Sequence, residues 1–267
     1  MLRVKKGPPG PSGKNAVELQ SWCPTGILSM FRTDEECTYY FNTKIDGLLY
    51  DRDKVIGLKD RFGNNNAICL QNFHKPEKIG KFYGISLEES LYKISNVETA
   101  TTPPSICVIA LQFKVAGVLT DDKKGYICCN ETLTRGVTIT KSNLNILGTD
   151  PMQLIYHYKD WNTLIIQYSN ITEDNDGKCF FILNNRRGYF TPHKNIVESK
   201  DLYIGGKKEK ESFARVVLAN FEVYWIDSPL PDPYLLPESI LNLIQNDMDY
   251  RTPVRSPPSR KKTKNIV

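Results

Sequence analysis

The stretch Asp60-Arg61-Phe62-Gly63-Asn64-Asn65-Asn66-Ala67 decides the fold of this 267-residue chain. Glycine and asparagine tolerate positive φ, and asparagine also bonds to its own backbone, so the stretch predicts a tight polar turn between two pleated runs. Far downstream, Trp161-Asn162-Thr163-Leu164-Ile165-Ile166 and Leu202-Tyr203-Ile204-Gly205-Gly206 have the composition of sandwich strands. The three segments together predict an all-β protein.

The rest of the chain from Cys37 onward follows the same rhythm of short apolar or alternating runs broken by turn residues. Helical periodicity is confined to residues 87–94, a possible single short helix, and to residues 237–246, where Pro237 suits a first helical turn. Strands are expected at residues 38–42, 47–50, 54–58, 67–72, 81–85, 106–113, 125–129, 137–140, 144–147, 153–158, 163–168, 178–183, 202–204 and 215–225.

Length and composition predict one domain with tails. A chain with 40% hydrophobic residues can bury one substantial core. We expect a Pro/Gly leader at residues 1–36, a sandwich with a closing helix at 37–250 and a disordered basic tail at 251–267. The tail holds six of the basic residues, namely Arg251, Arg255, Arg260, Lys261, Lys262 and Lys264.

The formal net charge of +5 therefore belongs to the tail, because 29 basic and 30 acidic residues remain without those six. A near-neutral body gives no support to a nucleic-acid-binding face, so nucleic acid is expected only at the tail, if at all. The tail could equally engage an acidic partner or an import receptor, or be a solvated end.

The leader contains Gly7-Pro8-Pro9-Gly10-Pro11-Ser12-Gly13, two Gly-X-Y triplets closed by a third glycine. Only glycine fits the axis of a collagen triple helix, so Gly7, Gly10 and Gly13 suggest a short neck in a trimer, with a flexible leader as the alternative. The basic first residues lead into no apolar segment, so no signal peptide is visible and a virion or intracellular location is expected. No run is long enough to span a bilayer.

Seven cysteines form an odd set without the CxxC spacing of a zinc site. We expect reduced thiols, and neighbours on a strand such as Cys128 and Cys129 should point to opposite faces of the sheet. The full set is Cys23, Cys37, Cys69, Cys107, Cys128, Cys129 and Cys179.

The polar turn resembles one found in the laminin-G-like branch of the concanavalin A-like lectin superfamily, with Phe62 where that family usually has a small hydroxyl residue. The resemblance continues in a strand that opens on an aromatic residue and ends in tyrosine, and in a following hairpin at Asp174-Asn175-Asp176-Gly177. The matching positions are Asp60, Gly63, Asn64, Asn66, Trp161, Leu164, Ile166 and Tyr168.

The closing elements are the most specific part of this resemblance. They combine a short strand ending in Ile204-Gly205, a long strand that includes Phe221 and Val223, and a terminal helix. The match covers roughly residues 37–246, although Arg215-Val216 stands where the family usually opens the long strand with glycine. The resemblance implies a two-sheet antiparallel jelly-roll sandwich with a short C-terminal helix and flexible tails.

Glycanases of this superfamily need two carboxylates spaced i and i+4 on one strand, so that both project toward the sugar. The chain contains no such run, and its nearest acidic clusters fall in predicted turns or at a helix start. A glycoside hydrolase is therefore the minor alternative, and no catalytic residue is assigned.

Ligand binding is expected instead in two loops, through Asn64, Asn65 and Asn66 in one and Asp174 and Asp176 in the other. Relatives hold calcium between loop carboxylates and carbonyl groups, so calcium at the two aspartates is possible, with a plain hairpin turn as the alternative. No other metal or cofactor is expected. His157 lies in an alternating run and is interpreted as a core or sheet histidine, and most of the 14 tyrosines as packing residues.

The sequence therefore predicts a non-enzymatic binding or structural protein that presents its sandwich to glycan or protein partners. The missing signal, the Gly-X-Y neck and a resemblance of that neck to those before viral and phage fibre heads favour a self-associating virion component. The alternatives are a polysaccharide hydrolase of the same fold and an intracellular scaffold that recruits partners through residues 251–267.

Overall fold

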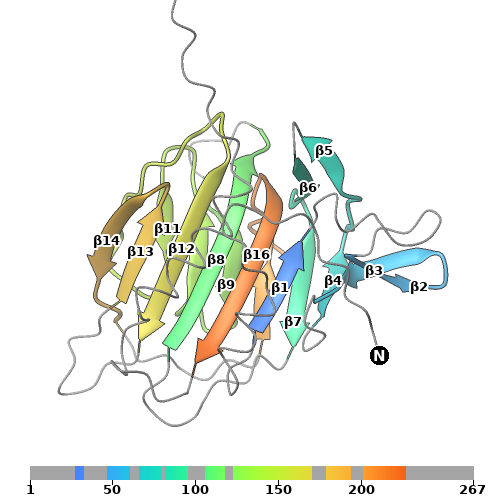
Figure 1. The fold of residues 1–267 in the computed structure, drawn as a ribbon, viewed down its shortest axis with the longest axis horizontal. Coiled ribbons are helices and arrows are strands. Elements are labelled where there is room, and N and C mark those ends of the chain that lie inside the picture. Colours follow the sequence, from blue (N-terminus) through green and yellow to red (C-terminus); the bar gives the residue numbers. More distant parts are fainter. Residues whose placement is uncertain are drawn as a thin grey trace, which may run out of the picture.

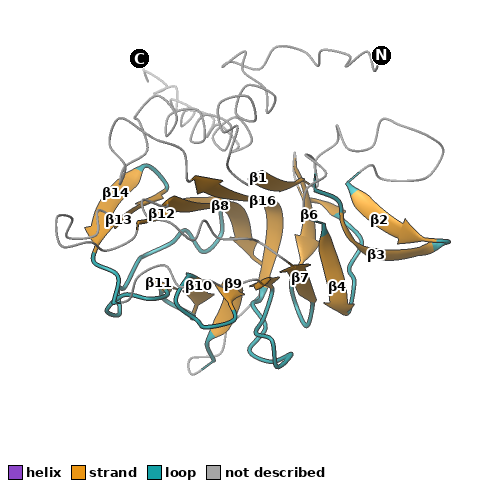
Figure 2. Cartoon of the chain, turned by 90° about the horizontal axis from the view of Figure 1, so that it is seen from below, coloured by secondary structure: helices purple, strands orange, loops and turns teal. Residues whose placement is uncertain are grey.

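The computed structural model describes residues 28–32, 47–60, 66–79, 82–95, 106–117, 123–169, 179–193 and 201–226. These ranges contain 16 strands and no helix, and therefore no helix able to cross a membrane. Every strand pairing is antiparallel, and the strands form two sheets that face each other. The predicted all-β antiparallel sandwich is confirmed. Figure 2 shows the layers, with β8 and β16 in one and β9 and β10 in the other.

The first sheet is built around two long strands that pair over most of their length (Figure 1). Its order is β14 (Arg186–Phe190), β13 (Cys179–Leu183), β12 (Asn162–Ser169), β8 (Ile106–Val115), β16 (Val216–Ile226), β6 (Phe82–Ser86) and β5 (Glu77–Ile79), and β1 (Leu28–Arg32) also pairs with β16.

The second sheet has shorter strands and is assembled from segments far apart in the chain. Its order is β11 (Leu144–Ile146), β10 (Gly136–Ile139), β9 (Gly125–Asn130), β15 (Asp201–Ile204), β7 (Leu91–Ser95), β4 (Ala67–Gln71), β3 (Lys54–Leu58) and β2 (Leu48–Asp51).

Apolar side chains that alternate along the strands fill the space between the sheets. On β12, Leu164, Ile166 and Tyr168 belong to this core, and each is at most 1% exposed. Burial of a large aliphatic side chain contributes roughly 1.5–3 kcal/mol, so the alternating pattern sets which face of each strand turns inward. All eight residues of β12 are buried, which means that this sheet is covered on both faces at its centre.

The core is also tied together by a hydroxyl group that joins strands from both sheets. Tyr168 on β12 accepts a hydrogen bond from the amide of Gly136 (3.0 Å) and lies 3.1 Å from the Gly136 carbonyl oxygen and 3.3 Å from that of Leu147. Gly136 adopts φ +129°, a conformation that other residues rarely take. This contact fixes β10 relative to the opposite sheet.

Two predicted elements are wrong. Residues 87–90 form a turn in which Glu89 has φ +55°, and a strand, β7, follows in place of the expected helix at 87–94. Tyr92 and Ile94 face the core while Leu91 packs on the outer face, so the apolar residues serve both faces of a strand. The strand expected at 153–158 is reduced to one bridge between Leu154 and Leu144.

Other differences concern segments that the pattern does not single out. The strands β5 and β14 were not expected, and β1 lies inside the segment assigned to the leader. The strand expected at 38–42 and the helix expected at 237–246 lie outside the described residues. The remaining predicted strands match observed ones within a few residues at each end.

The five described cysteines are free thiols. Cys128 belongs to the core between the sheets and Cys129 to a small cluster on the outer face, as expected for neighbours on a strand. Burial raises the pKa of Cys179 to about 11 and that of Cys129 to about 12, and it also raises the pKa of Cys107. These thiols stay protonated at neutral pH, so they are poor nucleophiles and poor metal ligands.

Candidate functional site

One end of the sandwich gathers most of the described connections between strands. The last residues of β8 pair with the first residues of β12 (Phe113 with Asn162) and of β16 (Val115 with Val216). We call this the β8 end, and β12 and β16 point their arrowheads away from it in Figure 1. Its described loop residues include 72–76, 87–90, 116–117, 123–124, 140–143, 154–161, 184–185 and 205–215.

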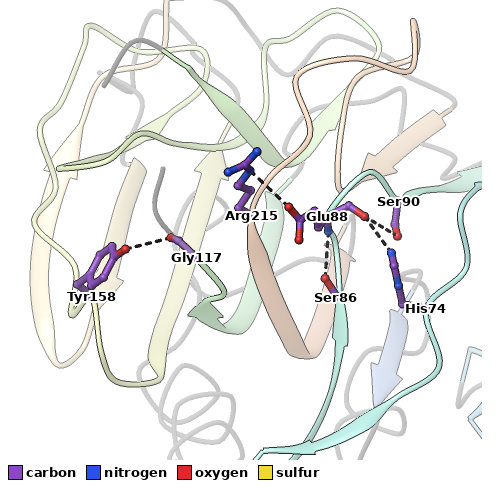
Figure 3. A network of polar contacts seen from close by, with 7 residues as sticks. All are labelled: His74, Ser86, Glu88, Ser90, Gly117, Tyr158 and Arg215. Carbon is purple, nitrogen blue, oxygen red and sulfur yellow. Dashed lines mark hydrogen bonds and ion pairs between the residues drawn. The ribbon is translucent and has the colours of Figure 1, made fainter. Parts of the chain in front are cut away.

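Polar contacts join the loop at residues 72–76 to the loop at residues 87–90 (Figure 3). The ring of His74 donates through Nε2 to the carbonyl oxygen of Glu88 at 3.0 Å, and the Ser90 hydroxyl donates to the carbonyl oxygen of Asn72 at 2.5 Å. The carboxylate of Glu88 lies 3.6 Å from Nε of Arg215. Both of those side chains are about half exposed, so the ion pair adds little and the hydrogen bonds to the backbone hold the loops.

A buried asparagine holds the part of the β11–β12 connection that lies at this end. The side chain of Asn162 accepts from the amide of His157 (2.7 Å) and donates to the carbonyl oxygens of His157 (2.8 Å) and Asp160 (3.1 Å). Asn162 is fully buried. A side chain that satisfies three backbone groups over four residues fixes the conformation of that turn.

The same asparagine is joined to the neighbouring hairpin. Asn184 donates to Oδ1 of Asn162 at 2.8 Å, and its own Oδ1 accepts from the amide of Thr163 at 2.9 Å. Asn184 and Asn185 adopt φ +49° and +69°, as a two-residue hairpin between β13 and β14 requires. We call Asn162 and Asn184 the asparagine clamp, and it makes the 157–160 turn and the 184–185 hairpin one unit.

The clamped loop exposes large side chains. Ile155 is 72% exposed and Tyr158 is 41% exposed, whereas Tyr156 between them is buried. The Tyr156 hydroxyl donates to the carbonyl oxygens of Thr140 and Lys141, and burial raises its pKa to about 12. Tyr158 donates to the carbonyl oxygen of Gly117 at 3.0 Å (Figure 3), so its ring is oriented but remains accessible.

His157 is exposed on this loop, so its interpretation as a core or sheet histidine is wrong. The alternation of the segment is real, but it places His157 in the outward row with Ile155. The inward row is Leu154 and Tyr156, and both are buried in the core.

Of the five residues predicted to bind ligand, the described ranges include only Asn66. Its side chain is a turn cap, because Oδ1 accepts from the amide of buried Asp60 at 3.0 Å. Asn64, Asn65, Asp174 and Asp176 lie outside the described residues, as do Gly7, Gly10, Gly13, Arg260, Lys261, Lys262 and Lys264. The described strand ends that flank the two predicted loops lie at the end opposite the β8 end.

The described strands offer no glycanase pair. Their carboxylates are Asp51, Glu77, Asp201 and Glu222, which stand on four different strands. Glu222 is fully buried and receives hydrogen bonds from Asn220 (2.9 Å) and from the Tyr224 hydroxyl. Within the part of the chain that the structure describes, no three His, Cys, Asp or Glu side chains are grouped as metal ligands.

No protein-family model matches the chain, and no curated protein matches it significantly. Solved structures are similar in fold. A structure described as HCR/D-Sa-GBL1/C has a TM-score of 0.52 at 11% identity, over 84% of this chain and 52% of that one. The binding domain of botulinum neurotoxin DC in complex with rat synaptotagmin II has a TM-score of 0.51 at 10% identity, over 75% of this chain and 50% of that one.

This chain thus spans about half the length of those structures. Identities this low establish a shared β-sandwich fold and nothing about shared ligands.

Proposed function

We propose that this chain is a non-enzymatic binding protein that recognises a glycan or protein ligand with the loops at the β8 end. The observation that carries the proposal is the asparagine clamp, which fixes the backbone of the 157–160 turn next to exposed Ile155 and around exposed Tyr158. Pre-ordered loops bind more tightly because less conformational entropy is lost on binding. Binding surfaces are commonly placed on loops that a rigid scaffold positions.

The similar neurotoxin domain supports this class of function, since it was solved with a protein ligand, rat synaptotagmin II. The distribution of carboxylates supports binding over hydrolysis, because a retaining or inverting glycosidase needs two of them across one sugar bond. The resemblance to laminin-G-like domains, noted from the turn at residues 60–67, points to the same class.

A screen of the full-length protein on glycan and receptor-ectodomain arrays, alongside hydrolysis assays on the same glycans, tests the proposal. We expect retention of at least one ligand and no release of reducing sugar. Turnover of any bound glycan would show that the protein is an enzyme instead. Calorimetric titration of calcium into the full-length protein and into an Asp174→Asn, Asp176→Asn variant tests the expected calcium at these two residues, because binding heat that is lost in the variant would support it.

We further propose that the protein self-associates as a trimer through the Gly-X-Y leader and acts as a virion component. The support is the glycine register at Gly7, Gly10 and Gly13, which suits three parallel chains. Light scattering is expected to give three times the mass of 30.5 kDa for the full chain and a lower mass when residues 1–13 are removed. A monomer at micromolar concentration would contradict the trimer.

A further inference from the structure

The hairpin of β13 and β14 lies at the edge of the first sheet (Figure 1). Its outward face carries aromatic and basic side chains. The register pairs Ile182 with Arg187 and Phe180 with Tyr189, so these four side chains share one face. The other face belongs to the core, where the ring of Phe181 lies against Gly188 so closely that a Cβ there would be 2.4 Å from it. Arg187 and Tyr189 therefore point away from the core.

Arg187 is stacked on two rings of this face. Its guanidinium carbon lies 4.6 Å from the ring centroid of Phe180 and 5.4 Å from that of Tyr189. Stacking holds a guanidinium flat and directs its fork of N–H donors outward in the plane of the group. The group has five donors, so contacts within the chain and a contact with a ligand are compatible.

Tyr189 offers the apolar part of the same surface. Its side chain is 66% exposed, among the most exposed large hydrophobic residues described, while Phe180 beneath Arg187 is 1% exposed. A tyrosine ring at a strand edge loses little conformational freedom on binding, and it can stack on the C–H face of a sugar ring. The pair therefore presents an aromatic platform beside a fixed cation.

The described strands at this edge of the sheet carry only basic side-chain charges. Strands β12, β13 and β14 contain no aspartate or glutamate, and Arg186 precedes Arg187 on β14. The hairpin turn is held to the 157–160 loop by the asparagine clamp, so the strand that carries Arg187 and Tyr189 begins at the β8 end. A cation with a planar donor fork, without a carboxylate on its own strands, suits a planar anion.

We propose that Arg187 and Tyr189 form a subsite for an acidic sugar, whose carboxylate binds the Arg187 guanidinium in a bidentate manner while its ring stacks on Tyr189. This inference rests on the proposed binding function and specifies the class of ligand. A carboxylate is favoured over a sulfate because its two oxygens match the spacing of the guanidinium fork.

The test uses the full chain and matched probes. Immobilised oligosaccharides ending in glucuronic acid are compared with the same oligosaccharides ending in glucose, and sialyllactose is compared with lactose and with sulfated lactose. We expect the carboxylate-bearing member of a pair to bind about tenfold more tightly or better, as a charge-assisted hydrogen-bonded contact provides. Arg187→Gln should abolish that preference because it removes the charge, and Arg187→Lys should reduce it because lysine keeps the charge but lacks the fork.

Two further variants separate the parts of the subsite. Tyr189→Ala should weaken both members of a pair to a similar extent, and Arg186→Lys is the matched control because Arg186 pairs with Leu183 on the other face. Unchanged thermal unfolding shows that each variant is folded. Glycan binding without preference for the carboxylate, or equal loss in the Arg186 and Arg187 variants, would overturn the subsite alone. No binding to any glycan or protein would overturn the proposed function as well.

Discussion

Replacing Gly136 with alanine is expected to lower the free energy of unfolding by roughly 3–5 kcal/mol, through backbone strain and a steric clash together. Gly136 has φ +129°, and a Cβ at this position would lie 2.2 Å from the carbonyl oxygen of Cys128 and 2.7 Å from Cα of Cys129. Those atoms belong to the backbone of β9, so they cannot move without breaking the pairing of β9 with β10.

The same substitution should disturb the contact between the sheets. The amide and carbonyl groups of Gly136 both meet the hydroxyl of Tyr168, which is buried in the core. If the strand is displaced, the Tyr168 hydroxyl loses the geometry of its hydrogen bonds. A buried polar group that loses its hydrogen-bond partner lowers the free energy of unfolding by about 1–3 kcal/mol. Urea denaturation followed by far-UV circular dichroism measures the loss as a lower midpoint.

Gly117→Ala is the matched control, because a Cβ at Gly117 would have no heavy atom within 4 Å. Its expected effect on the midpoint is small. Equal midpoints for the Gly136 variant, the Gly117 variant and the wild type would contradict the packing of β10 against β9 described above.

The fold could be predicted from local pattern wherever large apolar residues recur at every second position of a strand. Residues 163–168 show this, because Leu164, Ile166 and Tyr168 mark the inward face of β12. The pattern fails at residues 87–94, where Leu91, Tyr92 and Ile94 have a spacing compatible with both a helix and a two-faced strand. The outer cluster that Leu91 joins, which includes Tyr126 and Tyr203, is made of residues far away in the sequence.

The site was harder to predict than the fold. The sequence does place Asn162 in a strand, but its role depends on Asn184, which is 22 residues away. Asn184-Asn185 is a recognisable turn signal, and with it β14 and the outward pair Arg187 and Tyr189 could have been found. The asparagine-rich turn at residues 60–67 drew attention instead, and the one ligand candidate described there, Asn66, caps that turn.

Asn162→Ala is expected to release the 157–160 loop and to weaken ligand binding at the β8 end by tenfold or more. The change removes three hydrogen bonds to the backbone of His157 and Asp160 and the acceptor for Asn184. Asn162 is fully buried, so the backbone groups and the Asn184 amide that lose their partner cannot form hydrogen bonds with water instead. We therefore expect the free energy of unfolding to fall by roughly 2–4 kcal/mol. Hydrogen exchange of the 157–160 amides should rise together with the dissociation constant.

Asn143→Ala is the control for this prediction, since Asn143 lies in another loop of the same end and its side chain donates to the exposed Ser142 hydroxyl. A second variant, Ile155→Lys, separates loop order from direct contact. Ile155 is 72% exposed, so its replacement should leave stability within about 0.5 kcal/mol while still reducing binding. Suppose that the Asn162 variant exchanged faster but bound its ligand as tightly as the wild type, and that the Ile155 variant also bound as tightly. Recognition would then have to occur away from the β8 end. The clamp would then order these loops for the stability of the sandwich alone.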